Sequence, residues 1–188
     1  MRDGEIRHVL IEGLRAEHAG QSDVRVWPEM SVCLGASRVD VGLVNGALSG
    51  YEIKSDRDNL GRLPSQIEHY SQCLDFASLV VGQRHLSTAR SLVPRWWGIV
   101  LARPTEGDSV ALVTKRKARR NPALSPFHVA QLMWREEAMA VLRNRGLHHG
   151  LSKATRWDLW DLLATLPIDE LRSEVRSALT ARPLLPTA

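Results

Sequence analysis

The chain has 188 residues, with 25 Lys and Arg against 21 Asp and Glu, and its formal charge is +4. Apolar residues make up 44% of it, which excludes disordered, collagen-like and low-complexity classes. No apolar run approaches the roughly 18 residues of a membrane-spanning helix, and the N-terminus lacks the apolar segment of a secretory signal. Cys33 and Cys73 are too few for a disulfide framework or a cysteine-based zinc site. The sequence therefore predicts a cytoplasmic protein that does not associate with membranes.

The charge is unevenly distributed along the chain. Residues 115–156 contain ten basic and two acidic residues, a local charge of +8, so the rest of the chain sums to −4. A basic region of this kind is typical of proteins that bind a polyanion, most often nucleic acid. The alternative is a solvated basic surface without a partner.

Hydrophobic periodicity predicts an α/β core over residues 1–120 and a basic helical extension, packed on that core, over residues 121–188. The core is expected to contain, in chain order, a helix over 3–17, an extended segment over 24–32, strands over 38–44 and 48–54, a helix beginning near 60, a buried strand over 78–82, a helix over 86–92, and strands over 97–102 and 110–114. The extension is expected to contain helices over 126–144, 153–165 and 168–181.

The most informative residues lie on the two strands that flank the Asn-Gly turn. Glu52 and Lys54 are two residues apart on one strand, so their side chains project from the same face. Asp40 lies on the partner strand and can supply a second carboxylate. Two converging carboxylates bind a hard divalent cation, Mg²⁺ or Mn²⁺, and a neighbouring lysine can stabilise phosphate charge or orient an attacking water.

The hairpin register tests this interpretation. A strict two-residue turn at Asn45-Gly46 would pair Asp40 with Tyr51 and turn Asp40 and Glu52 to opposite faces of the sheet. The site therefore requires one extra residue. Either a three-residue loop that includes Ala47 or a bulge at Gly50 would supply it.

These residues resemble the PD-(D/E)XK nuclease superfamily, which includes restriction enzymes, RecB-type nucleases and Holliday-junction resolvases. The resemblance covers about residues 3 to 82 and rests on Asp40, on the run Gly-Tyr-Glu-Ile-Lys-Ser-Asp from residue 50 and on their strand context. It implies a restriction-endonuclease-like αβββαβ core with a mixed sheet. It also implies that Asp40 and Glu52 hold the metal with the Ile53 carbonyl and that Lys54 serves the attacking water.

Three further residues follow from the same resemblance. Gln66 and Tyr70 match the Q-x-x-x-Y element of RecB-like members, and their spacing of four places them on one helical face. They would support Lys54 or touch phosphate. Glu5 stands where many members place a helix-borne acid for the metal, although it is equally interpreted as a first-turn acid favoured by the helix dipole. Glu29 is a further candidate.

The predicted function is metal-dependent hydrolysis of DNA phosphodiester bonds. The alternatives are a catalytically weak or inactive nucleic-acid-binding module on the same fold and a protein that acts only through partners. The sequence leaves open whether RNA replaces DNA and whether the protein forms a homodimer. The tryptophans are interpreted mainly as core, with base stacking on one of them as the alternative. Phosphate contact is predicted for five clustered basic residues, namely Lys115, Arg116, Lys117, Arg119 and Arg120.

Overall fold

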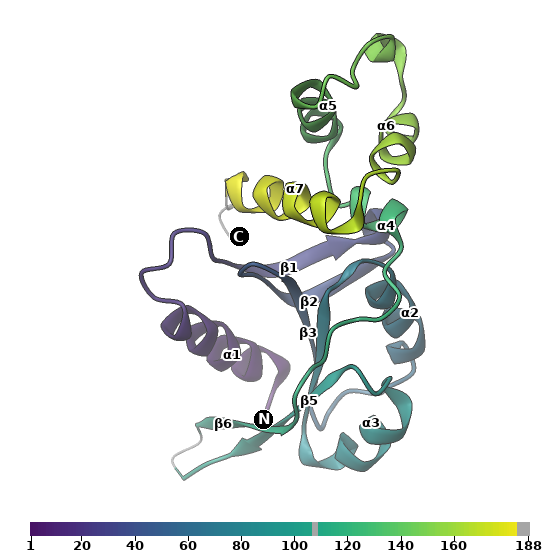
Figure 1. The fold of residues 1–188 in the computed structure, drawn as a ribbon. Coiled ribbons are helices and arrows are strands. Elements are labelled where there is room, and N and C mark those ends of the chain that lie inside the picture. The colour runs from purple at the N-terminus through teal and green to yellow at the C-terminus, as the bar shows by residue number, and fades with distance from the viewer. Residues whose placement is uncertain (107–108, 184–188) are drawn as a thin grey trace.

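The computed structural model describes residues 1–106 and 109–183 as an α/β fold built on one six-stranded mixed sheet in the order β1-β2-β3-β4-β5-β6 (Figure 1). The parallel pairs are β3 with β4 and β4 with β5, and the remaining neighbours are antiparallel. The strands are β1 (Arg25–Val32), β2 (Ser37–Val44), β3 (Leu48–Lys54), β4 (Phe76–Val81), β5 (Gly98–Pro104) and β6 (Val110–Arg116). The chain enters the sheet as α1-β1-β2-β3-α2-β4.

The β2–β3 hairpin has the extra residue that the site requires. Val44 pairs with Leu48 and Val41 pairs with Tyr51, so a three-residue loop joins the strands and the predicted irregularity is confirmed. Gly50 plays a different part from the bulge considered for it. A Cβ there would lie 2.5 Å from Cδ1 of Leu74, so glycine allows the side chain of Leu74 to pack directly on the strand.

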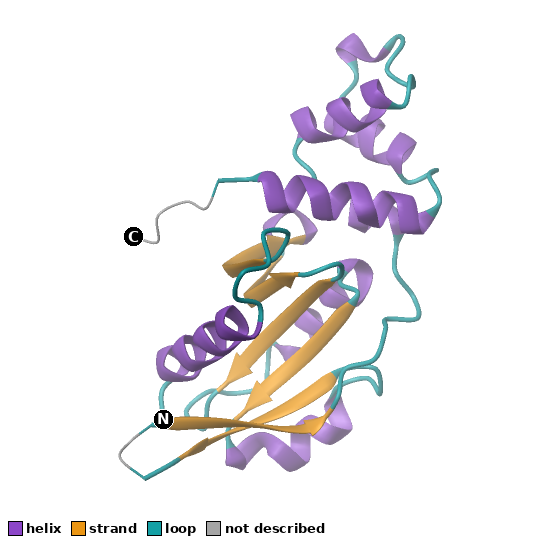
Figure 2. Ribbon diagram, turned by 60° about the vertical axis from the view of Figure 1, so that its left-hand side comes forward, coloured by secondary structure: helices purple, strands orange, loops and turns teal. Residues whose placement is uncertain are grey.

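Helices cover both faces of the sheet (Figure 2). Helix α1 (Asp3–Glu17) buries Ile6 and Leu10 against a cluster that includes Ile53 and Val80. Helices α2 (Leu63–Cys73) and α3 (Leu86–Leu92) pack on the other face, where the larger cluster lies. Strand β3 is thus buried between two layers. Among the described residues, no helix is long and apolar enough to cross a membrane.

The C-terminal helices belong to the same core as the sheet. They are α4 (Pro126–Ala130), α5 (Arg135–Asn144), α6 (Arg156–Leu163) and α7 (Ile168–Ala181). Leu142, Leu163 and Leu171 share one apolar cluster with Leu79 and Ile99 of the central strands. Helix α7 contacts β2 directly and α4 contacts α2, whereas α6 packs on α4 and α5 packs on α6.

The single helix predicted over 126–144 is wrong, because the chain leaves the helical path between α4 and α5. The carbonyl of Leu132 accepts a hydrogen bond from Arg182, and that of Met133 accepts one from the indole N–H of Trp160. These tertiary bonds replace the helical ones that the local sequence favours. The helix expected over 153–165 is likewise shorter, since a 3₁₀ turn over Leu151–Lys153 precedes α6.

Candidate functional site

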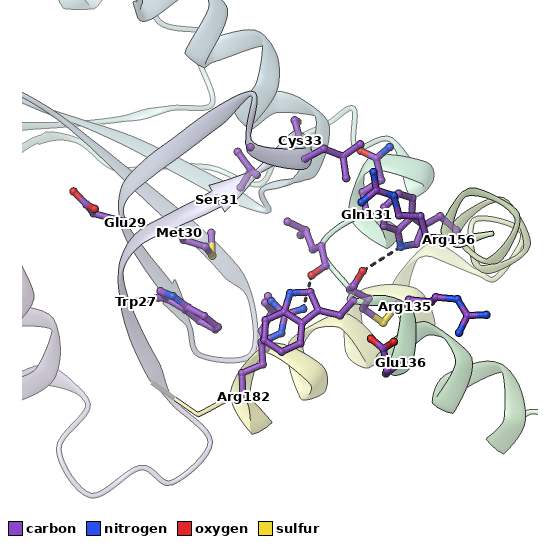
Figure 3. Close-up of a pocket in the computed structure, with 18 residues that line it drawn as sticks. Trp27, Glu29, Met30, Ser31, Cys33, Gln131, Arg135, Glu136, Arg156 and Arg182 are labelled. Carbon is purple, nitrogen blue, oxygen red and sulfur yellow. Dashed lines mark hydrogen bonds between the residues drawn. The ribbon is translucent and has the colours of Figure 1, made fainter. Parts of the chain in front are cut away.

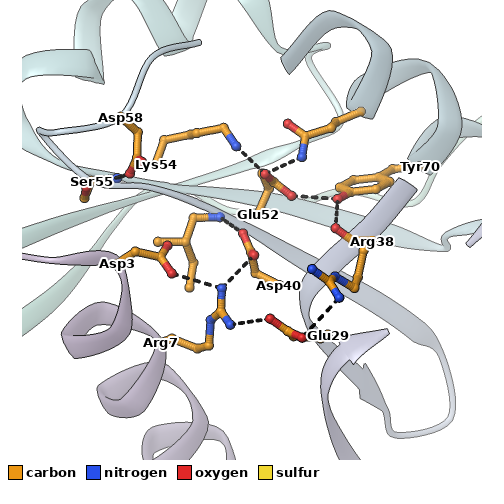
Figure 4. Close-up of polar contacts among 12 residues, drawn as sticks. Asp3, Arg7, Glu29, Arg38, Asp40, Glu52, Lys54, Ser55, Asp58 and Tyr70 are labelled. Atoms are coloured by element: carbon orange, nitrogen blue, oxygen red, sulfur yellow. Dashed lines mark hydrogen bonds and ion pairs between the residues drawn. The ribbon is translucent and has the colours of Figure 1, made fainter. Parts of the chain in front are cut away.

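Two adjoining cavities lie along β1. One, of about 650 Å³, lies between β1 and the C-terminal helices (Figure 3). The other, of about 630 Å³, is strongly polar and contains the candidate site (Figure 4). The site cavity is lined by side chains from α1, β1, β2, β3 and the loop and helix that follow β3, among them Asp3, Arg7, Glu29, Arg38, Asp40, Glu52, Lys54 and Gln66.

Asp40 lies where the pairing of β2 and β3 ends. The last paired residues are Val41 and Tyr51, and beyond them Oδ2 of Asp40 accepts the backbone N–H of Ile53 at 2.7 Å. The Asp40 carboxylate thus accepts the kind of hydrogen bond that a backbone carbonyl accepts between paired strands. Val39 packs in the cluster on the α2 side, whereas Val41 packs in the cluster on the α1 side. The side chains of β2 therefore switch from one face of the sheet to the other at Asp40. The Asp40 carboxylate lies where β2 and β3 separate.

Glu52 is the centre of a buried polar network. Its side chain is 2% exposed, and its Oε1 forms an ion pair with Nζ of Lys54. The same oxygen accepts a 2.6 Å hydrogen bond from Nε2 of Gln66, and Oε2 lies 2.6 Å from the hydroxyl of Tyr70. The Tyr70 hydroxyl also lies 2.8 Å from the carbonyl oxygen of Arg38. The structure thus brings together four of the predicted residues, Asp40, Glu52, Lys54 and Gln66, in one cavity, with Tyr70 directly behind Glu52.

Two largely buried carboxylates, Asp40 and Glu52, shift the pKa values of groups in the site. Burial and the charge of Glu52 raise the pKa of Asp40 to about 6, and the Ile53 N–H and Arg7 oppose this rise. Burial and the Glu52 carboxylate also raise the pKa of Tyr70, so its hydroxyl keeps its proton and acts as a donor. Asp40 and Glu52 are therefore close enough to repel each other, and a cation between them would relieve that repulsion.

Helix α1 contributes a cation that sequence reasoning missed. The guanidinium of Arg7 contacts Asp40 at 3.0 Å, Asp3 at 2.9 Å and Glu29 at 2.9 Å (Figure 4). Asp3 and Arg7 are four residues apart on the helix, so their pairing was visible as an i, i+4 pattern. Their convergence on Asp40 was not visible, because it depends on how α1 docks on the sheet. Glu29, a further candidate from the sequence, does line the cavity.

Glu5 does not join this group. Its side chain is exposed, and its Oε2 accepts the backbone N–H of Arg2 at 2.7 Å, which caps the start of α1. The acid that α1 places in the cavity is Asp3, two residues earlier. The structure therefore agrees with Glu5 as a first-turn acid, and it places Asp3 where the resemblance suggested Glu5.

The donor set fits a hard divalent cation. No group of three His, Cys, Asp or Glu side chains arranged to hold a metal occurs within residues 1–106 and 109–183. Mg²⁺, however, keeps several waters and is commonly held by one or two carboxylates. Asp40 and Glu52 supply two, and Glu52 is close enough to Asp40 to raise the pKa of Asp40. A backbone carbonyl of β3, as at Ile53, is a suitable further oxygen donor.

The five clustered basic residues lie apart from this cavity. Arg116 ends β6, at the opposite edge of the sheet from β1, and none of the five lines the site cavity. Arg116 is half-buried and donates to the carbonyls of Trp97 at 2.7 Å and Pro94 at 3.0 Å. It therefore has a structural role. The other four are exposed, namely Lys115, Lys117, Arg119 and Arg120.

Fold and site together describe an α/β protein with a six-stranded mixed sheet and a cluster of carboxylates and cations at the opening between two of its strands. The model of the family described as bacteriophage P4 protein cII matches residues 1–183, so the chain belongs to this family. Protein cII of Enterobacteria phage P4 is 26% identical over 183 residues, which are 97% of this chain and 68% of the phage protein. No solved structure matches the chain.

Proposed function

We propose that the protein is a divalent-metal-dependent nuclease that hydrolyses DNA phosphodiester bonds on a restriction-endonuclease-like PD-(D/E)XK core. The observation that carries the proposal is the meeting of Asp40 with Glu52 and Lys54 in one polar cavity, where the pairing of β2 and β3 ends. The element order α1-β1-β2-β3-α2-β4 supports the same core.

Asp40 and Glu52 are the proposed metal ligands. Each carboxylate keeps lone-pair capacity, because the described contacts use two acceptor positions on Asp40 and three on Glu52, and a carboxylate offers about four. A bound Mg²⁺ or Mn²⁺ would polarise a phosphoryl oxygen and lower the pKa of the attacking water. The protein's own part is to hold both carboxylates so that they point to one place. The hydrogen bonds from Ile53 and Gln66 do this.

Lys54 is the proposed catalytic residue. Its ammonium group has three donors, and the contact with Glu52 uses one of them. The others are available to orient the attacking water and to stabilise charge on the phosphate. In the reaction, the water oxygen bonds to phosphorus and one proton of the water passes to solvent. The bond from phosphorus to the leaving sugar oxygen breaks, and that oxygen takes up a proton from solvent. The products are a phosphate monoester and a free hydroxyl.

Gln66 and Tyr70 are proposed as positioning residues. Both contact Glu52, so they act on the metal ligand, whereas the resemblance suggested Lys54 or phosphate as their partner. The amide oxygen of Gln66, Oε1, is buried without a hydrogen-bond partner among the described residues. Because Gln66 lines the cavity, this acceptor is available to a water molecule or to a group of the substrate.

One observation favours a second candidate, an inactive module that only binds nucleic acid. Arg7 already pairs with Asp40, so a cation is present where a metal ion would otherwise neutralise the carboxylate. A protein that had lost catalysis would be stabilised by such a pair. The two candidates share the partner, DNA, and differ in whether metal-dependent products form.

Cleavage assays distinguish the two candidates. Plasmid, linear, single-stranded and branched DNA are incubated with Mg²⁺ or Mn²⁺ and with wild type, Lys54→Ala or Asp40→Ala. The exposed Lys153→Ala serves as the control for removal of a surface lysine. We expect products with wild type and the control alone, and none in EDTA. If the Asp40 and Lys54 variants cut DNA as well as wild type does, the nuclease proposal is wrong. If wild type binds DNA but forms no product, the inactive module is favoured.

A further inference from the structure

The second cavity adjoins the candidate site. Its volume of about 650 Å³ lies within the range of about 300–1,000 Å³ that is typical of ligand sites. It shares Glu29, Ser31 and Gly35 with the site cavity, so the two cavities are neighbours. Its walls come from β1 on one side and from the start of α5 and the segment after α7 on the other (Figure 3). A ligand that occupied both would run from the carboxylates toward the C-terminal helices.

Trp134 gives this cavity an exposed aromatic surface. The residue is 57% exposed, the highest value among the exposed large hydrophobic residues in the described part of the chain. The guanidinium of Arg182 lies 4.2 Å from the centroid of its ring, and Arg182 is itself held by Glu137 at 2.5 and 2.6 Å. The indole is thus supported from one side by a fixed planar cation. A large exposed aromatic ring on a rigid support is an unfavourable surface in water and a suitable platform for stacking.

Arginines line the same cavity. Arg156 is exposed, lies 5.5 Å from the ring centroid of Trp160, and forms no ion pair with any residue in the described part of the chain. Arg135 donates to the carbonyl of Ala154 and likewise lacks an acidic partner within those residues. Arg135 and Arg156 form no ion pair among the described residues, although the acids Glu29 and Glu136 line the same cavity. Two such arginines beside an exposed indole match the two groups of a nucleotide, which are an anionic phosphate and a flat base.

We propose that this cavity binds an unpaired segment of the polynucleotide, with a base stacked on Trp134 and backbone phosphates contacted by Arg156 and Arg135. This proposal rests on the proposed function and names the substrate class, which is DNA with a single-stranded part next to the bond that is cut. A duplex has its bases stacked internally and offers no free base to the indole. A docked protein segment is less well matched, because unpaired arginines line the wall beside the exposed indole.

The test measures binding in EDTA, where no metal-dependent cleavage occurs. A fluorescein-labelled oligothymidylate of 12 residues and a blunt hairpin duplex of equal length are titrated with the full chain, and fluorescence anisotropy is recorded. We expect wild type to prefer the single strand. Trp134→Ala should weaken single-strand binding by about 5- to 150-fold, the range for losing one base–aromatic stack. Arg156→Gln should weaken it too, and Trp134→Phe should restore most of the affinity.

Trp157→Ala is the matched control. Trp157 is also exposed, at 44%, but it packs on Phe127 and does not line the cavity. Its removal should leave affinity within twofold of wild type. Thermal melting and circular dichroism of each variant confirm that the fold is intact. Trp134→Leu keeps an apolar side chain but has no ring, and it replaces the Ala variant if that variant unfolds.

The outcomes separate this proposal from the nuclease itself. Unchanged single-strand affinity in the folded Trp134→Ala or Trp134→Leu variant overturns the stacking proposal, even if the wild type cuts DNA. Equal affinity for duplex and single strand overturns it as well, as does competition by micromolar thymidine 5′-monophosphate, which would indicate a free-nucleotide site. A loss of affinity with Trp134→Ala, together with normal binding by the folded Trp157→Ala control, supports the proposal whether or not products form.

Discussion

The guanidinium of Arg7 lies 3.0 Å from Oδ1 of Asp40, and the two residues are 33 positions apart in the chain. Arg7 also joins Asp3 and Glu29 at 2.9 Å each, so one cation holds acids from α1, β1 and β2 together. Its charge opposes the rise in the pKa of Asp40. The same charge would repel a metal ion that approached Asp40, so Arg7 and the proposed divalent cation would compete for one carboxylate.

Removing Arg7 should therefore strengthen metal binding. In Arg7→Ala, Asp3, Glu29 and Asp40 lose their shared cation, and we expect the affinity for Mn²⁺ at pH 8 to increase by about tenfold, or 1.4 kcal/mol. Isothermal titration calorimetry measures this directly. Arg15→Ala removes an exposed arginine from the same helix, and its affinity should match wild type. Weaker binding by Arg7→Ala would show that Arg7 organises the carboxylates and does not compete with the metal.

Metal affinity should depend on pH through Asp40. Its pKa is raised from 3.8 to about 6, so the carboxyl holds a proton that a metal ion must displace at lower pH. We expect the Mn²⁺ association constant to rise about tenfold per unit up to about pH 6 and to level off above pH 7. Calorimetry at half-unit intervals checks this. A constant affinity between pH 5 and 7 would mean that Asp40 is not a ligand.

The same shift affects stability without metal. Between about pH 4 and 6 the folded chain binds a proton at Asp40 that the unfolded chain has released, so this group's contribution to the free energy of unfolding falls as pH rises through that window. Asp40→Asn removes the contribution. In EDTA, wild type should therefore lose stability relative to Asp40→Asn between pH 4.5 and 7, as measured by urea unfolding.

Arg172 of α7 should be essential for stability. It lies 2.6 Å from Oδ1 of Asp75 at the start of β4, and the two side chains are only 7% and 3% exposed. Asp75 also accepts the backbone N–H of Leu48 at 2.7 Å. Arg172→Met leaves a buried carboxylate without its cation, and we expect a loss of about 3–5 kcal/mol in urea unfolding.

Two comparisons test the reason for that loss. Arg176→Met, on the same helix and without an ion pair among the described residues, should change the free energy of unfolding by about 0.5 kcal/mol or less. Asp75→Leu combined with Arg172→Met removes both charges and should recover much of the stability. If the double variant is as unstable as the single one, packing and not the unpaired charge is responsible.

The clustered basic residues should have two different roles, phosphate contact for four of them and structural support for Arg116. Replacing Lys115, Lys117, Arg119 and Arg120 with alanine should reduce the slope of log affinity for duplex DNA against log salt by about 0.9 for each phosphate that is no longer neutralised. Arg116→Ala should instead destabilise the fold, because it removes hydrogen bonds to the carbonyls of Trp97 and Pro94. Anisotropy at several salt concentrations and urea unfolding measure the two effects. An unchanged slope would show that these residues form only a solvated surface.

Local pattern was sufficient wherever neighbouring residues dictate structure. The alternation of polar and apolar residues in β2 and β3 and the turn chemistry of Asn45-Gly46 predicted the hairpin. The requirement that Asp40 and Glu52 share one face of the sheet predicted its extra loop residue. The helical period predicted α1 and α7 with the bounds observed. It was wrong where α4 and α5 separate, because side chains of Trp160 and Arg182, far along the chain, take the carbonyls that a continuous helix needs.

The sequence alone determined the uneven charge of the chain and the presence of carboxylates and a lysine in apolar strands. Residue type and the alternation of side chains along a strand are local properties. Only the tertiary structure decided that α1 brings Asp3 and Arg7, not Glu5, to Asp40, that Arg116 is structural, and that Trp134 lines a cavity beside the site. Those facts depend on how helices dock on the sheet. Docking is governed by burial and pairing between residues distant in sequence, which no local periodicity records.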